Sequence, residues 1–267
     1  SASALWLKIF IQDASSREWL MHLPSHQLDH IWIYFPEAPD GYREVRASRL
    51  EHYPSRGIIH EDFVFPLPEG LHGERPIYIR IATQQAMLDS TIWLHQSRAF
   101  AQFNRDRDFS MDAFFGLLIG LGLYNLLLFA FLRQQVFLFY VLYVGSFTLT
   151  WLSELGLGYR FVWPHAPEWN TVSVPTFAYA TMICIMLFTR EFLRTREHAP
   201  ILDRILLWMI PVKILSWLIV IRTATPWILD LMTPTLLLGF IPGLTAGWLT
   251  FRRGYRPALY YLAGQFL

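Results

Sequence analysis

The chain has 267 residues, of which 54% are hydrophobic and 16% are charged, whereas an average soluble domain carries about 25% charged residues. Its 22 Lys and Arg against 21 Asp and Glu leave a net charge of +1, so no nucleic-acid partner is expected. The single cysteine, Cys184, excludes an internal disulfide framework and a cysteine-rich zinc site. The composition argues against a wholly soluble protein.

Residues 1–97 show the period-two alternation of apolar and polar side chains that is typical of β-strands. Four segments carry it: 5–11, 31–35, 77–81 and 91–95. Turn sequences rich in Pro and Gly separate the segments, among them 39–41 and 66–70. Several short strands, each with one apolar face, predict a β-sandwich domain.

Residues 98–112 form a polar juxtamembrane connector, and residues 113–267 change to long uncharged runs. A hydrocarbon core of about 30 Å needs about 17 to 20 apolar helical residues. The expected spans are 113–132, 136–153, 171–189, 205–221, 226–251, and a sixth that begins at 257 and is cut off at 267. The sequence therefore predicts a multidomain membrane protein in which a transmembrane helical bundle follows the β-sandwich.

Most arginines between the spans lie in the connections after the first, third and fifth runs, and short loops rich in Lys and Arg normally face the cytoplasm. They are Arg133; Arg190, Arg194, Arg196 and Arg204; and Arg252, Arg253 and Arg256. The opposite connections carry only Arg160 and Arg222. This distribution predicts an extracytoplasmic N-terminal domain.

The external connection 154–170 is rich in amphipathic aromatic residues, including Tyr159, Phe161, Trp163 and Trp169. Such rings suit the headgroup boundary of a bilayer. An interfacial belt and a ligand lid both remain open for this segment.

Short motifs recur along the chain in a fairly specific order and spacing. In the N-terminal part they are Trp6-Leu7, Leu28-Asp29, Phe63-Val64-Phe65-Pro66 and Tyr78-Ile79-Arg80. In the helical part they are Phe115-Gly116, Leu123-Tyr124-Asn125-Leu126, Phe139-Tyr140-Val141-Leu142-Tyr143-Val144, Gly156-Leu157-Gly158-Tyr159, Val162-Trp163-Pro164, Phe188-Thr189-Arg190-Glu191-Phe192-Leu193, Arg253-Gly254-Tyr255-Arg256-Pro257-Ala258 and Tyr260-Tyr261. Through them the chain resembles the bacterial seven-transmembrane receptors with diverse intracellular signalling modules, including their extracellular β-sandwich domain.

The resemblance implies a jelly-roll-like external domain in the periplasm and a multi-pass bundle in the bacterial inner membrane. It also implies that this chain is the sensory part of a receptor, whose signal passes to a cytoplasmic cyclase or kinase module beyond residue 267. The chain opens on a strand without an initiator methionine or signal peptide. We therefore expect a fragment truncated at both ends, with the first strand of the external domain missing.

No Walker-type glycine loop, His-Glu-x-x-His motif or Gly-x-Ser-x-Gly elbow occurs in the sequence, so neither an enzyme nor a cofactor is expected within these residues. His22, His26 and His30 are spaced by four, which on a helix would align three imidazoles as metal ligands. Pro24 breaks such a helix. Surface or strand-edge positions are therefore expected for these histidines, and no metal site.

Trp32, Tyr34, Tyr78 and Trp93 lie opposite the aliphatic positions of their strands. If that face is open, their rings could stack on a flat small-molecule ligand such as a carbohydrate, as the resemblance to carbohydrate-binding jelly rolls implies. Packing against a loop, a partner or the membrane surface is the alternative. The sequence leaves the ligand unidentified.

Lys213 lies near the middle of an expected span, where a charge costs about 2.5 to 3.5 kcal/mol. It could pair with Asp230 or Glu154 as part of a signalling switch. The alternative is an inward-facing lysine neutralised by burial or held by carbonyls beside Pro211. Asn125 is a candidate for an interhelical hydrogen bond.

Two other functions compete with a receptor. In a transporter or channel, Lys213 and Glu154 would line a substrate path together with Pro175, Pro211, Pro234 and Pro242, although the helical halves show no internal repeat. In an accessory membrane subunit, the chain would only bind partners. The expected partners of the receptor are the lipid bilayer, a small-molecule ligand and the cytoplasmic module; a homodimer remains open.

Overall fold

The computed structural model describes residues 4–12, 18–25, 28–37, 40–53, 58, 60–68, 75–83, 91–223 and 240–266. It divides into two compact units, which are described separately. One comprises residues Ser1–Asp112 and Leu152–Thr171, and the other comprises Ala113–Trp151 and Val172–Leu267.

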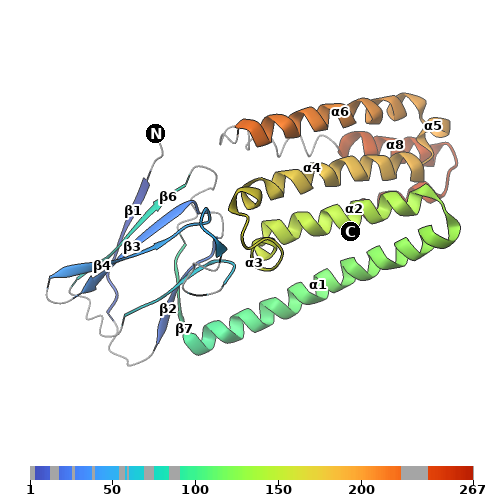
Figure 1. Cartoon of the computed structure of the whole chain (residues 1–267). Helices are drawn as coiled ribbons and strands as arrows, with labels where there is room; N and C mark the ends of the chain where they lie inside the picture. Colours follow the sequence, from blue (N-terminus) through green and yellow to red (C-terminus); the bar gives the residue numbers. More distant parts are fainter. Residues whose placement is uncertain are drawn as a thin grey trace. The chain divides into compact units, whose positions relative to one another are not determined.

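The first unit contains two antiparallel sheets (Figure 1). The four-stranded sheet has the order β1-β6-β3-β4 and the three-stranded sheet the order β5-β2-β7. The strands are β1 (Ala4–Ile9), β2 (Trp19–Leu23), β3 (His30–Glu37), β4 (Gly41–Ala47), β5 (Phe63–Pro66), β6 (Ile77–Ala82) and β7 (Trp93–Gln96). The β-sandwich predicted from the alternation is confirmed.

The sandwich core is built from the aliphatic positions that the period-two pattern picks out. Ile31, Ile33 and Phe35 of β3 are at most 2% exposed, and so are the alternate isoleucines of β6. They pack in one cluster with Met21 of β2 and with Phe63 and Phe65 of β5. The outer face of the four-stranded sheet is therefore left to the intervening residues.

The alternation expected for 91–95 does not hold in β7. Leu94, expected on the apolar face, is 42% exposed. The half-buried side chain is His95, whose ring lies 5.6 Å from that of His22. Polar side chains take the inward positions here because the strand adjoins a cluster of ionisable groups.

The first helix, α1 (Ser97–Leu132), runs without interruption for 36 residues. The polar segment 98–112 is thus helical and continuous with the first expected span. Its N-terminal part belongs to the sandwich unit, where Phe100 is buried against the rings of His22 and His60.

The segment between α2 (Gln135–Glu154) and α4 (Pro167–Phe192) folds onto the sandwich within the same unit. It contains the short helix α3 (Leu157–Phe161), which follows Gly156 at a φ of 71°. Tyr159 is 2% exposed, and its hydroxyl donates a hydrogen bond to the backbone oxygen of Glu51. The Tyr53 amide also bonds to the Pro164 carbonyl oxygen, at 3.1 Å. Tyr159 is thus buried against the sandwich rather than exposed as an interfacial ring, whereas Phe161 is 66% exposed.

The second unit is a helical bundle. Side-chain contacts join α1 to α2, α2 to α4, α4 to α6 (Pro200–Thr223) and α4 to α9 (Pro257–Phe266). The short helix α5 (Thr195–His198) and α8 (Phe240–Arg252) complete its described part. Among the described residues, α1, α2, α4 and α6 are long and apolar enough to cross a membrane.

Candidate functional site

The outer face of the four-stranded sheet carries a continuous set of aromatic rings and cations. Trp32 and Tyr34 alternate with the buried isoleucines of β3, and Tyr78 and Arg80 do so on β6. Because Trp32 pairs with Arg80 and Tyr34 with Tyr78 in the sheet register, the four side chains lie on one face in two rows.

Two aromatic side chains of other strands extend this face. The Trp6 ring of β1 stacks on Tyr34, with ring centres 6.1 Å apart and an interplanar angle of 16°. Tyr42 of β4 lies 5.6 Å from Tyr78. Trp6 is 56% exposed and Tyr42 38%, so flat apolar surface remains accessible to solvent.

Arg80 lies between two indole rings on this face. Its guanidinium carbon is 4.3 Å from the centre of the Trp32 ring and 5.8 Å from that of Trp6. These cation–π contacts hold the guanidinium close to both rings and leave its N–H groups available to a ligand.

The structure separates Trp93 from the other three residues predicted for the ligand face. Trp93 belongs to β7, in the other sheet, where it is 53% exposed and stacks on His95. Trp32, Tyr34 and Tyr78 are brought together as expected from the alternation. The face that we now call the outer aromatic face consists of Trp6, Trp32, Tyr34, Tyr42, Tyr78 and Arg80.

A second site in the same unit is centred on a buried carboxylate. Glu61 precedes β5 and is 4% exposed. Its Oε2 accepts a hydrogen bond of 2.9 Å from Nη1 of Arg160 in α3, and its Oε1 contacts the guanidinium of Arg107 in α1. Two arginines from separate segments thus compensate one buried charge, which would otherwise be costly.

Asp62 and two histidines adjoin this carboxylate. The Asp62 carboxylate lies 3.1 Å from Nε2 of His22 and 3.6 Å from the Arg107 guanidinium. His60 accepts a hydrogen bond at Nδ1 from the Asp62 amide, and its Nε2 faces the Asn104 side-chain oxygen at 3.4 Å. Burial, assisted by the charge of Arg107, lowers the pKa of His60 to about 4.

Ligand atoms of His22, His60 and Asp62 lie within 4.8 Å of one another, which is close enough for a metal ion. The hydrogen bonds argue against that use. The Asp62 amide already occupies the Nδ1 lone pair of His60, and its Nε2 faces both the Asn104 side chain and the Arg107 guanidinium, whose charge would repel a metal ion. The guanidinium of Arg107, 3.4 Å from that Nε2, supplies the positive charge instead.

The three histidines spaced by four are dispersed by the fold. His22 is 3% exposed in the central strand β2, so the expected surface or edge position is wrong for it. Met21 and Leu23 beside it are also buried, so the short strand β2 is covered on both faces. His30 is exposed at the start of β3, and His26 lies outside the described residues.

The intramembrane candidates lie in different places. Lys213 is 4% exposed in α6. Asn125 donates a hydrogen bond of 2.9 Å to the Leu121 carbonyl oxygen of its own helix, rather than joining two helices. Glu154 is the last residue of α2 and belongs to the sandwich unit. Asp230 lies outside the described residues, so the switch remains an expectation.

Sequence reasoning missed Glu61, Arg107 and Arg160 as a cluster. The available signal was weak: Arg160 is one of only two cations in the external connections, and the triplet His60-Glu61-Asp62 interrupts an otherwise apolar stretch. Trp6 could have been added to the ligand face, because it alternates with the half-buried aliphatic positions of β1 as Trp32 alternates with the buried ones of β3.

A β-sandwich followed by apolar helices able to cross a bilayer is the architecture of a membrane protein with a folded N-terminal domain. The family model described as "7TM diverse intracellular signalling" matches residues 109–267, and the model "7TMR-DISM extracellular 2" matches residues 1–95. The chain belongs to this family of seven-transmembrane receptors. No curated protein and no solved structure matches it.

Proposed function

We propose that the chain is the sensory part of a bacterial receptor of the inner membrane. The β-sandwich detects a ligand in the periplasm, and the helical bundle passes the signal to a cytoplasmic output domain of the cyclase or kinase type beyond residue 267. Covalent chemistry is not required of these residues.

The double pairing of Glu61 carries this proposal. A change in the loop before β5 alters the contacts of Arg107, whose helix continues to Leu132, and of Arg160, whose segment lies between α2 and α4. A buried carboxylate with two guanidiniums tolerates few intermediate positions, because a displaced charge loses its compensation. Such an element can have two discrete arrangements, and ligand binding can favour one of them.

We further propose that the ligand is a carbohydrate bound on the outer aromatic face. Sugar rings present flat C–H surfaces that stack on accessible aromatic rings, which the exposed Trp6 and the half-buried Trp32 and Tyr34 supply. Arg80, fixed between two rings, would donate hydrogen bonds to sugar hydroxyl or carboxylate oxygens. Flat apolar contact with a few oriented donors is the usual composition of a small-molecule site.

The test is the activity of the output domain in the full-length receptor. E61Q keeps the shape of the side chain and removes the charge that Arg107 and Arg160 share. We expect the basal output to change about fivefold or more, the lower range of measured coupling between sites. E51Q is the matched control, because Glu51 is exposed and uses only its backbone oxygen in the contact with Tyr159.

Equal output from E61Q, E51Q and the parent would overturn the proposed coupling. An accessory subunit predicts this indifference. A transporter predicts that E61Q leaves the output of any fused module unchanged while substrate flux depends on Lys213. The two measurements together separate the three functions.

A further inference from the structure

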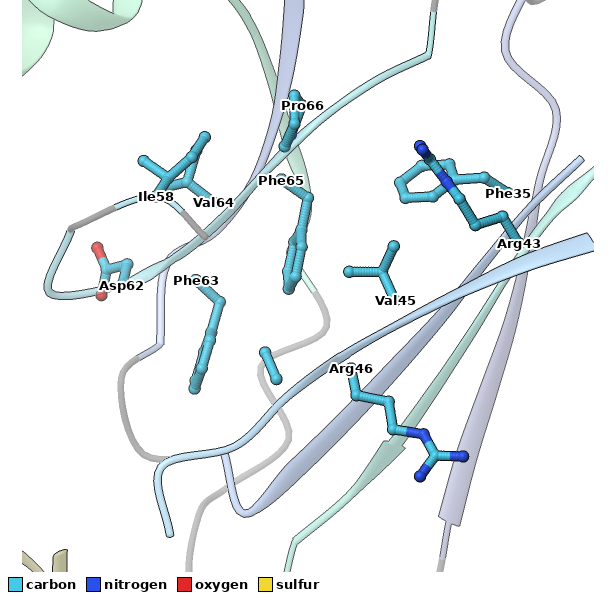
Figure 2. Close-up of a pocket in the computed structure, with 11 residues that line it drawn as sticks. Phe35, Arg43, Val45, Arg46, Ile58, Asp62, Phe63, Val64, Phe65 and Pro66 are labelled. Carbon is cyan, nitrogen blue, oxygen red and sulfur yellow. The ribbon is translucent and has the colours of Figure 1, made fainter. Parts of the chain in front are cut away.

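A cavity of about 300 Å³ opens between β4 and β5, the neighbouring edge strands of the two sheets (Figure 2). It lies at the end of the sandwich core rather than on the outer aromatic face. Its volume is at the lower end of the range for small-molecule sites, about 300 to 1,000 Å³. An occupant must therefore be small.

The interior of the cavity is lined by apolar rings and aliphatic groups. Phe35, Phe63 and Phe65 line it, and each is at most 6% exposed. Figure 2 shows Val45 pointing into the space between the rings of Phe35 and Phe65. Three rings around a small volume favour a flat apolar group, because ring pairs gain from stacked and edge-to-face contacts.

Two arginines line this cavity, Arg43 and Arg46. Arg43 faces Phe35 across the β3–β4 ladder, and its guanidinium carbon is 5.9 Å from the centre of the Phe35 ring. Within the described ranges of the chain, no carboxylate forms an ion pair with Arg43. Arg46 differs, because it contacts the Glu44 carboxylate and pairs with Trp32 of the outer face.

We propose that this cavity binds a small aromatic monocarboxylate of the arylalkanoate type. The aromatic ring of the ligand packs among Phe35, Phe63 and Phe65, and its carboxylate receives a bidentate pair of hydrogen bonds from Arg43. Size, ring lining and an arginine, Arg43, that forms no ion pair within the described residues together select this occupant. The inference is independent of a carbohydrate on the outer aromatic face, since the two sites share no residue.

The cavity adjoins the cluster around Glu61. Ile58 and Asp62 line it, and the Asp62 carboxylate also contacts His22 and the guanidinium of Arg107. A ligand in the cavity therefore touches the same short segment that holds Glu61. Binding would act on the pairing with Arg107 and Arg160 without reaching either arginine.

The experiment is a calorimetric titration of the purified chain in lipid nanodiscs with phenylpropionate. Phenylpropanol and phenylpropylamine, which keep the ring but remove or reverse the charge, are the ligand controls. R43Q removes the cation, and V45F fills the cavity with a ring of the protein's own. R98Q is the matched control, because Arg98 is exposed on α1 outside the cavity.

We expect one phenylpropionate bound per chain, with R98Q equal to the parent. R43Q loses the charge-assisted hydrogen bonds to the carboxylate, so it should bind phenylpropionate at least about tenfold more weakly than the parent. V45F should not bind it. Equal affinity of the parent for the acid and the amine, or unchanged binding by R43Q, would overturn the inference. Because Arg43 is exposed, R43Q remains informative even if V45F fails to fold.

Discussion

Arg160 donates a hydrogen bond of 2.9 Å to Glu61, a residue 99 positions earlier in the chain. The two residues belong to parts of the sequence with different character: one precedes a sandwich strand, and the other lies between two apolar helices. Burial of Glu61 makes the pairing obligatory, because an uncompensated carboxylate at that position would be strongly destabilising.

The first prediction concerns this pairing. R160Q should increase hydrogen exchange in a peptide covering residues 58–66 about tenfold, because Glu61 loses one of its two cations. The double variant E61Q/R160Q should lower the free energy of local opening by less than the sum of the two single changes, since no unpaired carboxylate then remains. Exchange measured by mass spectrometry checks both statements. R105Q, a change at an exposed arginine of α1, is the control, and additive effects would argue against a direct pair.

A second prediction concerns Gly158 in α3. A Cβ atom there would lie 2.2 Å from Cζ2 of Trp163, so the indole or the helix must move. G158A should destabilise the packing of α3 by about 1 to 3 kcal/mol, as overpacking usually does. Limited digestion with trypsin reads this out, because Arg160 is a cleavage site within α3. G120A is the control, since Gly120 has open space around its Cβ position; equal cleavage of both variants would contradict the prediction.

The third prediction separates the outer aromatic face from the other sheet. W32A and W6A should each weaken binding to an oligosaccharide microarray about tenfold, because each removes a stacking ring and one wall of the Arg80 site. W93A should bind as the parent does, since Trp93 lies on the three-stranded sheet. A loss of binding confined to W93A would place the ligand on the three-stranded sheet and contradict the prediction.

The fourth prediction is a dependence of stability on pH. The pKa of His60 falls from an ordinary 6.5 to about 4 in the folded chain, so between these values the unfolded state binds the extra proton. Stability from this group is complete above pH 6.5 and declines as the pH falls toward 4, by about 3 kcal/mol at most. His60 faces His22, Glu61, Asp62 and Arg107, all close enough to act on its charge.

H60N tests this pH dependence. An asparagine keeps an acceptor near the position of Nδ1 and removes the titration. Thermal unfolding of the parent between pH 7.5 and pH 5 should show a decline that H60N flattens. H30N, a change at an exposed histidine, should leave the decline as it is. A parent curve that is flat in this range would refute the assignment.

The alternation of apolar and polar residues predicts the fold where one face of a strand is buried and the other is exposed to solvent. The strands β1, β3 and β6 follow from their alternate isoleucines and leucines, and the apolar helices follow from their length. The pattern is silent on β4, whose charged residues Arg43, Glu44 and Arg46 hide the two inward positions of Val45 and Ala47. It is also silent on sheet order, because the pairing of β1 with β6 joins residues 68 to 78 positions apart.

The same limit applies to the sites. Trp32, Tyr34 and Tyr78 could be grouped from the sequence, because one register places them on one face. The cluster of Glu61, Arg107 and Arg160 could not, since it is assembled from a loop and from two separate helices, α1 and α3, with no shared period. Long-range ion pairs depend on tertiary packing, which a single sequence does not encode in any local window.

The charged character of β4 has a consequence for assembly. In the described residues this strand pairs on one side only, with β3, so its other edge presents unpaired backbone groups. Arg43, Glu44 and Arg46 stand along that edge, and charged side chains discourage the edge-to-edge addition of a further strand. This charge protects the folding chain from aggregation, and it disfavours the pairing of two copies of this domain through β4.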